Sequence, residues 1–343
     1  MSDDIVRQQM PLQTPWQTAD PFLFCMHHDD RYPPGDERMG PDASLEGRAI
    51  GNDFSGKEGW SMYHGERVPG FPRHPHRGFE TITLCRSGYI DHSDSLGATA
   101  RFGEGDVQWM TAGNGVVHSE MFPLLDRESP NHTELFQIWL NLPREDKKKQ
   151  AYFTMFWDEE IPRRTFRDDE QRETEVTVIA GALEEVEPPE PPPSSWASRR
   201  ESEVAVWTLA MQPGAQWTLP PASEEANRLL YFFAGEECEI GGERVECGRA
   251  VEVRPEVECP IANGEATGEL LMLQGRPIGE PVVQHGPFVM NSQGEIRQAM
   301  LDFRRDGFGG WPWEEDAPVH PREKGRFAVH ADGTEERPGE AAG

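Results

Sequence analysis

Apolar residues in the first half of the chain occur in short runs that are separated by turn residues. The runs at residues 79–85, 107–110 and 135–142 combine β-branched and aromatic side chains, and the last is apolar almost throughout. Such composition is typical of β-strands, and a nearly continuous apolar run indicates a strand buried on both faces. Asn114-Gly115 is a turn signal between strands. The pattern predicts a first β-barrel over residues 15–146.

The second half of the chain shows the same kind of pattern after a charged connection. Its apolar runs lie at residues 176–180, 204–211, 229–233 and 270–273. Two β-rich halves of similar length predict an all-β protein with a duplicated barrel, the second over residues 147–313.

Three segments carry too little apolar surface to join either core. Residues 1–14 and 314–343 are polar, and we expect both to be flexible ends. Residues 184–200 are acidic and rich in proline, which favours an extended, mobile surface loop.

One amphipathic helix is predicted near the C-terminus. Ser292 and Glu295 fit a capping box, and Gly307 fits the glycine that follows a helix. Between them, apolar residues recur at helical spacing, at Ile296, Ala299, Met300 and Phe303. The segment is expected to be a short helix that packs on a sheet.

Charge excludes two classes of partner. The 343 residues include 61 Asp and Glu against 33 Lys and Arg, a formal net charge of −28. A field of this sign repels phosphate backbones and anionic lipid surfaces, so we expect no direct nucleic-acid binding and no membrane docking. No run approaches the 18 apolar residues of a membrane span.

The cysteines and the N-terminal residues bear on the compartment. The five cysteines are odd in number and contain no CxxC pair, which fits neither a disulfide framework nor a thiolate zinc site. The first residues lack the apolar stretch of a secretory signal. The expected location is therefore the cytoplasm.

Two pairs of polar residues carry the candidate chemistry. His74 and His76 are two residues apart, and His118 and Glu120 repeat that spacing. Residues i and i+2 of a strand point to the same face, so two neighbouring strands could bring four ligands together. Each histidine alone is more often a surface or structural residue, and Glu120 alone is more often a solvated acid. Four inward polar side chains would be costly without a partner, and a metal ion supplies one.

Several longer motifs strengthen this interpretation. They are HPHRGFET at 74–81, GDVQWMTAG at 105–113, VHSE at 117–120, QIWLNLP at 137–143 and EPVVQHGPFVMN at 280–291. Together they closely resemble the pirin family of the cupin superfamily, over residues 20–307. The resemblance implies a bicupin with two antiparallel jelly-roll barrels, of which only the first binds a metal.

The family's ligand set is three histidines and one glutamate. Carried over, it implies His74, His76, His118 and Glu120, the same set that the spacing indicates. In cupins more generally the acid of the first motif is a ligand, which makes Glu80 an alternative. The only histidine between residues 143 and 313 is His285, so the second barrel cannot form an imidazole-rich site.

The resemblance also implies a metal and an activity. Pirins are associated with iron, and Fe(II) suits these ligands, although Mn, Ni, Cu and Zn suit them too. Bacterial members are linked to quercetin 2,3-dioxygenase activity, which implies a flavonol-like substrate and dioxygen. Glu120 is then the candidate catalytic base, and Phe79, Trp109 and Met110 are candidates for a substrate pocket, with core packing equally expected for each. His64 lies in a Gly-rich loop that could reach the mouth of the site or lie on the surface.

A second function stays open at this point. Eukaryotic pirins are linked to transcriptional co-regulation, so the alternative is a metal- or redox-responsive regulatory protein that acts through a protein partner.

Overall fold

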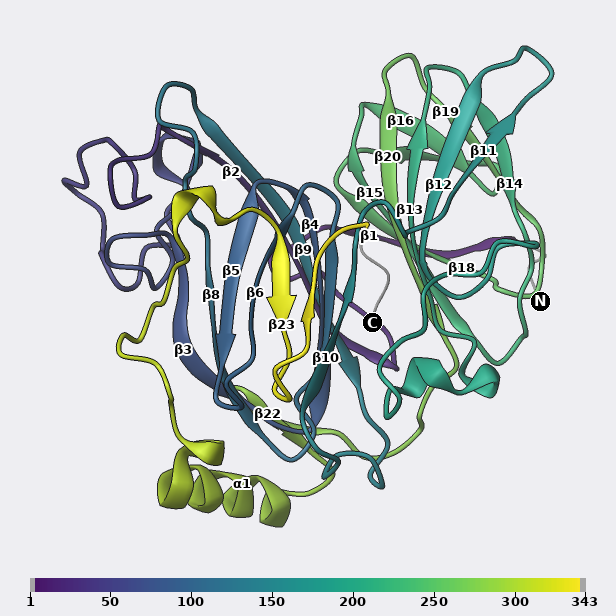
Figure 1. Cartoon of the computed structure of the whole chain (residues 1–343). Coiled ribbons are helices and arrows are strands. Elements are labelled where there is room, and N and C mark those ends of the chain that lie inside the picture. Colours follow the sequence, from purple (N-terminus) through teal and green to yellow (C-terminus); the bar gives the residue numbers. More distant parts are fainter. Residues whose placement is uncertain (1–3, 340–343) are drawn as a thin grey trace. The chain divides into compact units, whose positions relative to one another are not determined.

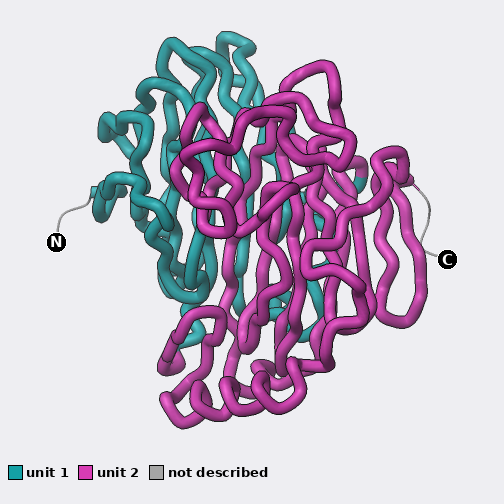
Figure 2. The backbone as a smooth tube through the Cα atoms, turned by 90° about the vertical axis from the view of Figure 1, so that its left-hand side faces the viewer, with its two compact units in different colours: residues 1–25, 160–279 teal, residues 26–159, 280–343 magenta. Residues whose placement is uncertain are grey.

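The computed structural model describes residues 4–339 and divides into two compact units. Unit 1 consists of Met1–Cys25 and Glu160–Gly279, and unit 2 of Met26–Glu159 and Glu280–Gly343 (Figure 2). Each unit therefore combines segments that are far apart in the sequence.

Unit 2 is built from two antiparallel sheets (Figure 1). Their strand orders are β10-β7-β4-β9-β2 and β24-β23-β6-β5-β8-β3. The strands of the first sheet are β2 (Phe22–Tyr32), β4 (Phe79–Ser87), β7 (Val107–Thr111), β9 (Asn131–Asn141) and β10 (Tyr152–Phe156). Those of the second are β3 (Gly70–His76), β5 (Tyr89–Asp94), β6 (Thr99–Gly103), β8 (Val116–Met121), β23 (Phe327–Val329) and β24 (Glu335–Glu336).

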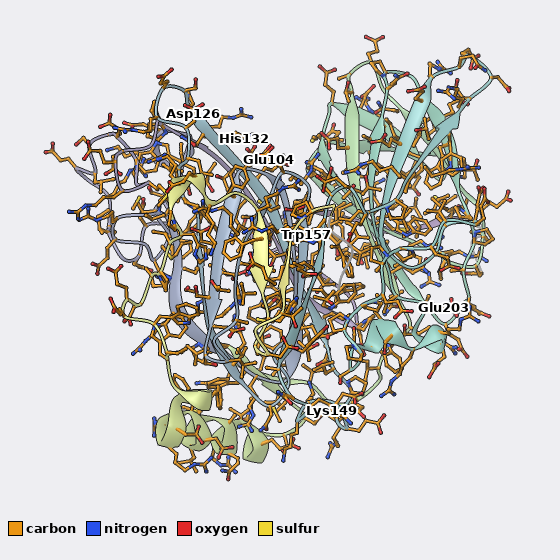
Figure 3. The ribbon with its side chains drawn as sticks, in the orientation of Figure 1. Glu104, Asp126, His132, Lys149, Trp157 and Glu203 are labelled. Atoms are coloured by element: carbon orange, nitrogen blue, oxygen red, sulfur yellow. The ribbon has the colours of Figure 1, made fainter. Side chains whose placement is uncertain are left out.

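The core of unit 2 lies between these sheets. Alternate residues of each strand point inward, so Ile90 and Phe102 from one sheet pack in the same cluster as Met110 and Phe153 from the other. Figure 3 labels His132 and Lys149, which lie at opposite ends of this barrel.

Unit 1 is also a pair of antiparallel sheets, ordered β1-β18-β15-β20-β13-β12-β11 and β14-β19-β16-β17. The first sheet contains β1 (Val6–Pro11), β11 (Arg163–Arg167), β12 (Glu173–Ala180), β13 (Ala205–Met211), β15 (Asn227–Ala234), β18 (Arg249–Val253) and β20 (Gly268–Gly275). The second contains β14 (Gln216–Leu219), β16 (Glu237–Ile240), β17 (Glu243–Glu246) and β19 (Cys259–Asn263). Trp207, Leu230 and Ile261 are among the side chains of its buried cluster.

The predicted fold class is confirmed: two antiparallel β-barrels with one short helix. Helix α1 (Gln293–Asp306) begins after Ser292, whose hydroxyl accepts a hydrogen bond from the Glu295 backbone, and ends at Gly307 with φ 59°. Within residues 4–339, no helix has the length and apolar character needed to cross a bilayer.

The remaining elements are short. They are the hairpin β21 (Val283–His285) and β22 (Phe288–Met290), and the 3-10 turns η1 (Lys57–Gly59), η2 (Trp196–Ser198), η3 (Arg200–Ser202), η4 (Gly307–Gly309) and η5 (Arg322–Lys324).

The domain boundaries differ from those predicted at residues 146 and 313. Strand β10 pairs with β7, so the first barrel continues to Glu159. Helix α1 packs against β22 and buries Ile296 beside Val117, so it belongs to unit 2 and not to the second barrel. Apolar periodicity identifies such elements but does not say which core receives them.

The N-terminal segment is a strand where a flexible end was predicted. Strand β1 pairs with β18 from Val6 to Pro11, and Val6 is buried in the core of unit 1. Residues 1–3 of the predicted flexible end lie outside the described residues.

The prediction of a flexible C-terminal tail is wrong for most of its length. Strand β23 pairs with β6, and Phe327 is fully buried. The buried Arg101 side chain binds Asp91 through two nitrogens and donates to the carbonyl oxygens of residues 320, 321 and 322. The tail is ordered because its backbone satisfies a buried arginine. Residues 340–343 lie outside the described part.

The acidic, proline-rich loop at residues 184–200 is anchored at its end. The Trp196 indole donates to the Arg276 carbonyl oxygen, and Ser195 is fully buried. This end of the loop therefore packs on unit 1 instead of extending into solvent.

Replacing Phe327 with alanine tests the docking of the tail. The side chain is fully buried against β6, so its loss should destabilise unit 2 by about 3–5 kcal/mol. Thermal unfolding followed by circular dichroism measures this. Leu301, 56% exposed on α1, is the matched control, and Leu301→Ala should change stability by less than about 0.5 kcal/mol. Equal melting temperatures for both variants would contradict a packed tail.

Candidate metal centre

Three imidazoles converge inside unit 2. His74 and His76 come from β3 and His118 from β8, and His74 lies directly opposite His118 in the antiparallel pairing. The ring centroids are 4.8 Å apart for His74–His76, 4.5 Å for His74–His118 and 4.9 Å for His76–His118. One nitrogen of each ring lies within 4.8 Å of the others, which is close enough for all three to share one cation.

The local sequence of β3 explains this arrangement. His74 and His76 flank Pro75 and share a face, as strand alternation requires. Proline cannot donate to a ladder, and β3 tolerates Pro72 and Pro75 because it is the edge strand of its sheet. A register shift between Phe71 and His74 bends the strand just before the first histidine.

The rings are held neutral by burial. Desolvation lowers the pKa of His76 and His118 well below the ordinary value, and the neighbouring imidazoles add to the shift. Burial likewise lowers the pKa of His74 to about 4. Neutral imidazole is the form that binds a metal ion.

Two of the three rings have unsatisfied nitrogens. Both ring nitrogens of His76 and of His118 are buried without a hydrogen-bond partner. The Pro287 backbone acts to raise the pKa of His76, against the larger effect of burial. His74 Nδ1 lies 2.9 Å from the Pro72 carbonyl oxygen, which fixes the tautomer and leaves Nε2 free to bind. Buried orphan nitrogens cost free energy, and a divalent cation would satisfy them.

Glu120 lies beside the histidines but outside the group whose ligand atoms converge. Its Oε2 is 3.7 Å from His118 Nε2 and accepts a hydrogen bond of 2.9 Å from Gln137, while Thr83 donates to Oε1 at 3.4 Å. The carboxyl is buried, and desolvation raises its pKa. Glu120 as fourth ligand therefore stays a prediction.

His92 was missed by the sequence analysis. It lies on β5 directly opposite Glu120, is fully buried, and its ring centroid is 5.4 Å from that of His118. A single histidine has no pattern that marks it, and only the pairing of β5 with β8 brings it to the site. Among residues 4–339, the ligand atoms that converge come from the other three histidines, so His92 is a neighbour of the candidate ligands.

The alternative ligand Glu80 points away from the histidines. Thr83 of the same strand reaches Glu120, so odd-numbered residues of β4 face the site and Glu80 faces the other side, where Thr111 donates to it at 2.5 Å. Glu80 lies four residues after His76, so in one continuous strand both would point to the same face. The turn at Gly78, which has φ 88°, breaks this alternation. A Cβ there would collide with the Val289 carbonyl oxygen, so the turn requires glycine.

The predicted pocket residues separate in the structure. Phe79 lies beside the site, with its ring 5.1 Å from that of His76, and Trp139 packs at 4.2 Å on Phe79. Met110 points inward but into the hydrophobic core. Trp109 is the residue before Met110 in β7, so it points to the opposite face of the sheet, where it contacts Phe156. Trp139 was missed because it belongs to a uniformly apolar run whose inward residues cannot be told apart.

His64 and His285 lie at the surface. His64 is exposed, with Nδ1 2.8 Å from the Gly51 carbonyl oxygen. His285 is exposed at the end of β21 and belongs to unit 2.

Two barrels and a buried cluster of histidines in one of them define a bicupin with a candidate metal centre. The pirin family model matches residues 5–140, and the model of the pirin C-terminal cupin domain matches residues 206–309. The chain belongs to the pirin family.

Similar proteins come from bacteria, plants and animals. A protein of Pseudomonas aeruginosa provisionally named quercetin 2,3-dioxygenase is 35% identical over 69% of this chain and 79% of its own. Pirin-1 of Arabidopsis thaliana is 37% identical over 70% of this chain and 79% of its own, and human pirin is 33% identical over 72% and 81%. The solved structure of a quercetin 2,3-dioxygenase from Acinetobacter baumannii, 29% identical, has a TM-score of 0.66 and covers 85% of this chain and 87% of that one.

Replacing His118 with alanine should abolish stoichiometric metal binding. The variant removes the ring that faces both other imidazoles. Anaerobic loading with Fe(II), removal of free metal and elemental analysis give the occupancy. His285→Ala, which alters an exposed histidine, should bind as much iron as the parent protein. Full occupancy in His118→Ala would rule out this centre.

The metal-free protein should lose stability as the pH falls from about 6.5 towards 4. Burial holds the pKa of His74 at about 4 and that of His28 at about 3, so in this range the unfolded chain binds protons that the folded chain does not. Burial raises the pKa of Asp30 and Asp106 to about 6 and also raises that of Glu120, and these three carboxyls act in the opposite direction. They oppose four imidazoles whose pKa burial lowers, those of His28, His74, His76 and His118. Melting temperatures of chelator-treated protein at several pH values test this. A constant melting temperature across the range is the contrary result.

Proposed function

We propose that this protein is a metal-dependent dioxygenase that cleaves quercetin-type flavonols, with iron bound by His74, His76, His118 and Glu120. The observation that carries the proposal is the convergence of three neutral imidazoles, of which His76 and His118 are buried, beside a buried carboxylate. The names of the Pseudomonas and Acinetobacter relatives support the choice of reaction.

The residues present fit an iron ion. Imidazole and carboxylate are ligands of intermediate softness that suit Fe(II), and they also accept Mn, Ni, Cu or Zn. When bound, Fe(II) would supply Lewis-acid activation of a chelating flavonol and an exchangeable position for dioxygen.

Glu120 is the residue that we expect to move the proton. A flavonol loses its 3-hydroxyl proton before cleavage, and a base must lie within hydrogen-bond reach to take it. Burial raises the pKa of Glu120, which makes the carboxylate a stronger base. Gln137 and Thr83 donate to its two oxygens and hold the carboxylate next to His118.

Aromatic side chains on one wall of the site suit an aromatic substrate. Trp139 lies 5.5 Å from the His76 ring and packs on Phe79. We expect these rings to offer flat apolar surface to a planar ligand.

Oxygen uptake by the iron-loaded protein with quercetin tests the proposal. The parent protein should consume one dioxygen for each flavonol cleaved and release carbon monoxide. Glu120→Gln should lower the turnover number by about 100-fold or more, because it removes the base. Glu66→Gln, at an exposed acid in the connection before β3, is the control and should retain full activity.

Two results would contradict the proposed dioxygenase function or the proposed role of Glu120. Iron-saturated protein that consumes no oxygen with flavonols would exclude the dioxygenase and favour a regulatory role through a protein partner. Undiminished turnover by Glu120→Gln would remove that residue from the reaction.

A further inference from the structure

An exposed phenylalanine lies in the connection between β2 and β3. Figure 1 shows the backbone of this connection in dark purple and blue. Phe54 is 53% exposed, although a ring of this size is usually buried. It contacts other aromatic rings, with centroid distances of 5.4 Å to Tyr63 and 5.1 Å to His64. Isolated exposed apolar residues need no explanation, but an exposed ring within an aromatic cluster does.

The loop that carries Phe54 is held in place by a buried ion pair. Arg48 donates to Asp53 at 2.9 Å and to the Trp60 carbonyl oxygen at 2.9 Å, and its guanidinium lies 3.3 Å from the Trp60 ring centroid. Asp53 in turn accepts hydrogen bonds from Ser55 and from the Met62 backbone. Phe54 is therefore presented to solvent by a braced loop, and its position is preorganised.

The loop closes on the strand that carries the histidines. Asp53 and Tyr63 exchange backbone hydrogen bonds, and Tyr63 adopts φ 56°, a conformation that costs free energy for a bulky residue. The Tyr63 ring stacks on Phe71 at 5.2 Å, and its hydroxyl donates to the buried Asp30 carboxylate at 2.5 Å. The strained residue is thus fixed on both sides.

A continuous line of rings leads from Phe54 to the candidate metal centre. The His64 ring lies 5.1 Å from Phe54 and 5.8 Å from Phe71, and the Phe71 ring lies 6.3 Å from that of His74. His74 is the partly exposed member of the three candidate ligands, while His76 and His118 are buried. The line of rings therefore ends at the candidate ligand that is nearest to solvent.

We infer that Phe54, His64 and Phe71 form an outer aromatic subsite that stacks on the distal ring of a planar polyphenol whose other end binds at the histidines. This inference rests on the proposed function, because it specifies which part of a flavonol the protein recognises. Stacking on a fixed aromatic side chain is favourable and tolerant of exact geometry, which suits a family of related substrates.

His64 supplies the polar contact of this subsite. Its Nδ1 donates to the Gly51 carbonyl oxygen at 2.8 Å, so Nε2 is the ring nitrogen that can accept a hydrogen bond. A hydroxyl group on the distal ring is the donor that such an acceptor recognises. The subsite therefore prefers a hydroxylated ring to an unsubstituted one.

Anaerobic binding titrations separate this subsite from catalysis. The protein is loaded with Fe(II), and binding of quercetin is compared with that of 3-hydroxychromone, which has the same chelating oxygens and no distal ring. Phe54→Ala should weaken quercetin binding by about tenfold and leave 3-hydroxychromone binding unchanged. Phe54→Trp should restore quercetin binding, and Leu301→Ala on the exposed face of α1 is the surface control.

A second titration addresses His64. His64→Ala should weaken quercetin binding several-fold but leave galangin, a flavonol without distal-ring hydroxyls, nearly unaffected. Circular dichroism and iron content, measured for every variant, show that the fold and the centre are intact.

The outcomes distinguish the inference from the proposed function. Equal weakening of quercetin and 3-hydroxychromone by Phe54→Ala, or no weakening of either, overturns the subsite even if the parent protein cleaves quercetin. Selective weakening with no oxygen consumption supports the subsite while the dioxygenase fails. A parent protein that binds neither ligand overturns both.

Discussion

The burial of imidazoles without protein partners is the constraint on which the rest of unit 2 depends. His76 and His118 keep both ring nitrogens unsatisfied in a barrel interior, and desolvation holds them neutral. Such groups cost about 1–3 kcal/mol each, so a well-packed core must keep the strands closed around them. The barrel supplies that packing, and the same unsatisfied nitrogens give a cation its binding energy.

Segments remote in sequence hold the ligand strands in position. Arg77 follows His76 directly and donates to Asp302 of α1 at 2.8 Å, while its backbone exchanges hydrogen bonds with residues 287 and 289. The C-terminal segment therefore fixes the end of β3, which is an edge strand and would otherwise lack a neighbour on one side. This is the physical reason why residues 280–339 pack with the first barrel.

Buried arginines order the irregular parts of unit 2. Arg101 donates hydrogen bonds to three carbonyl oxygens of the C-terminal tail. Arg48 donates to Asp53 and to two carbonyl oxygens of the loop that carries Phe54. Both guanidiniums are paired with a buried aspartate, which offsets the cost of removing the charge from water. These segments are polar in composition, but their hydrogen bonds to buried arginines keep them ordered.

Local spacing in the sequence determined the elements and half of the geometry of the site. The i, i+2 spacing of His74 with His76 places two imidazoles on one face of any strand, and the capping residues Ser292 and Gly307 delimit α1, because these are properties of a few adjacent residues. The tertiary structure alone decided that His74 faces His118, that His92 adjoins them, that Glu80 and Trp109 point elsewhere, and that the charged tail completes a sheet. Each of these outcomes depends on the register between strands distant in sequence, and one residue of slippage there would turn every side chain to the opposite face.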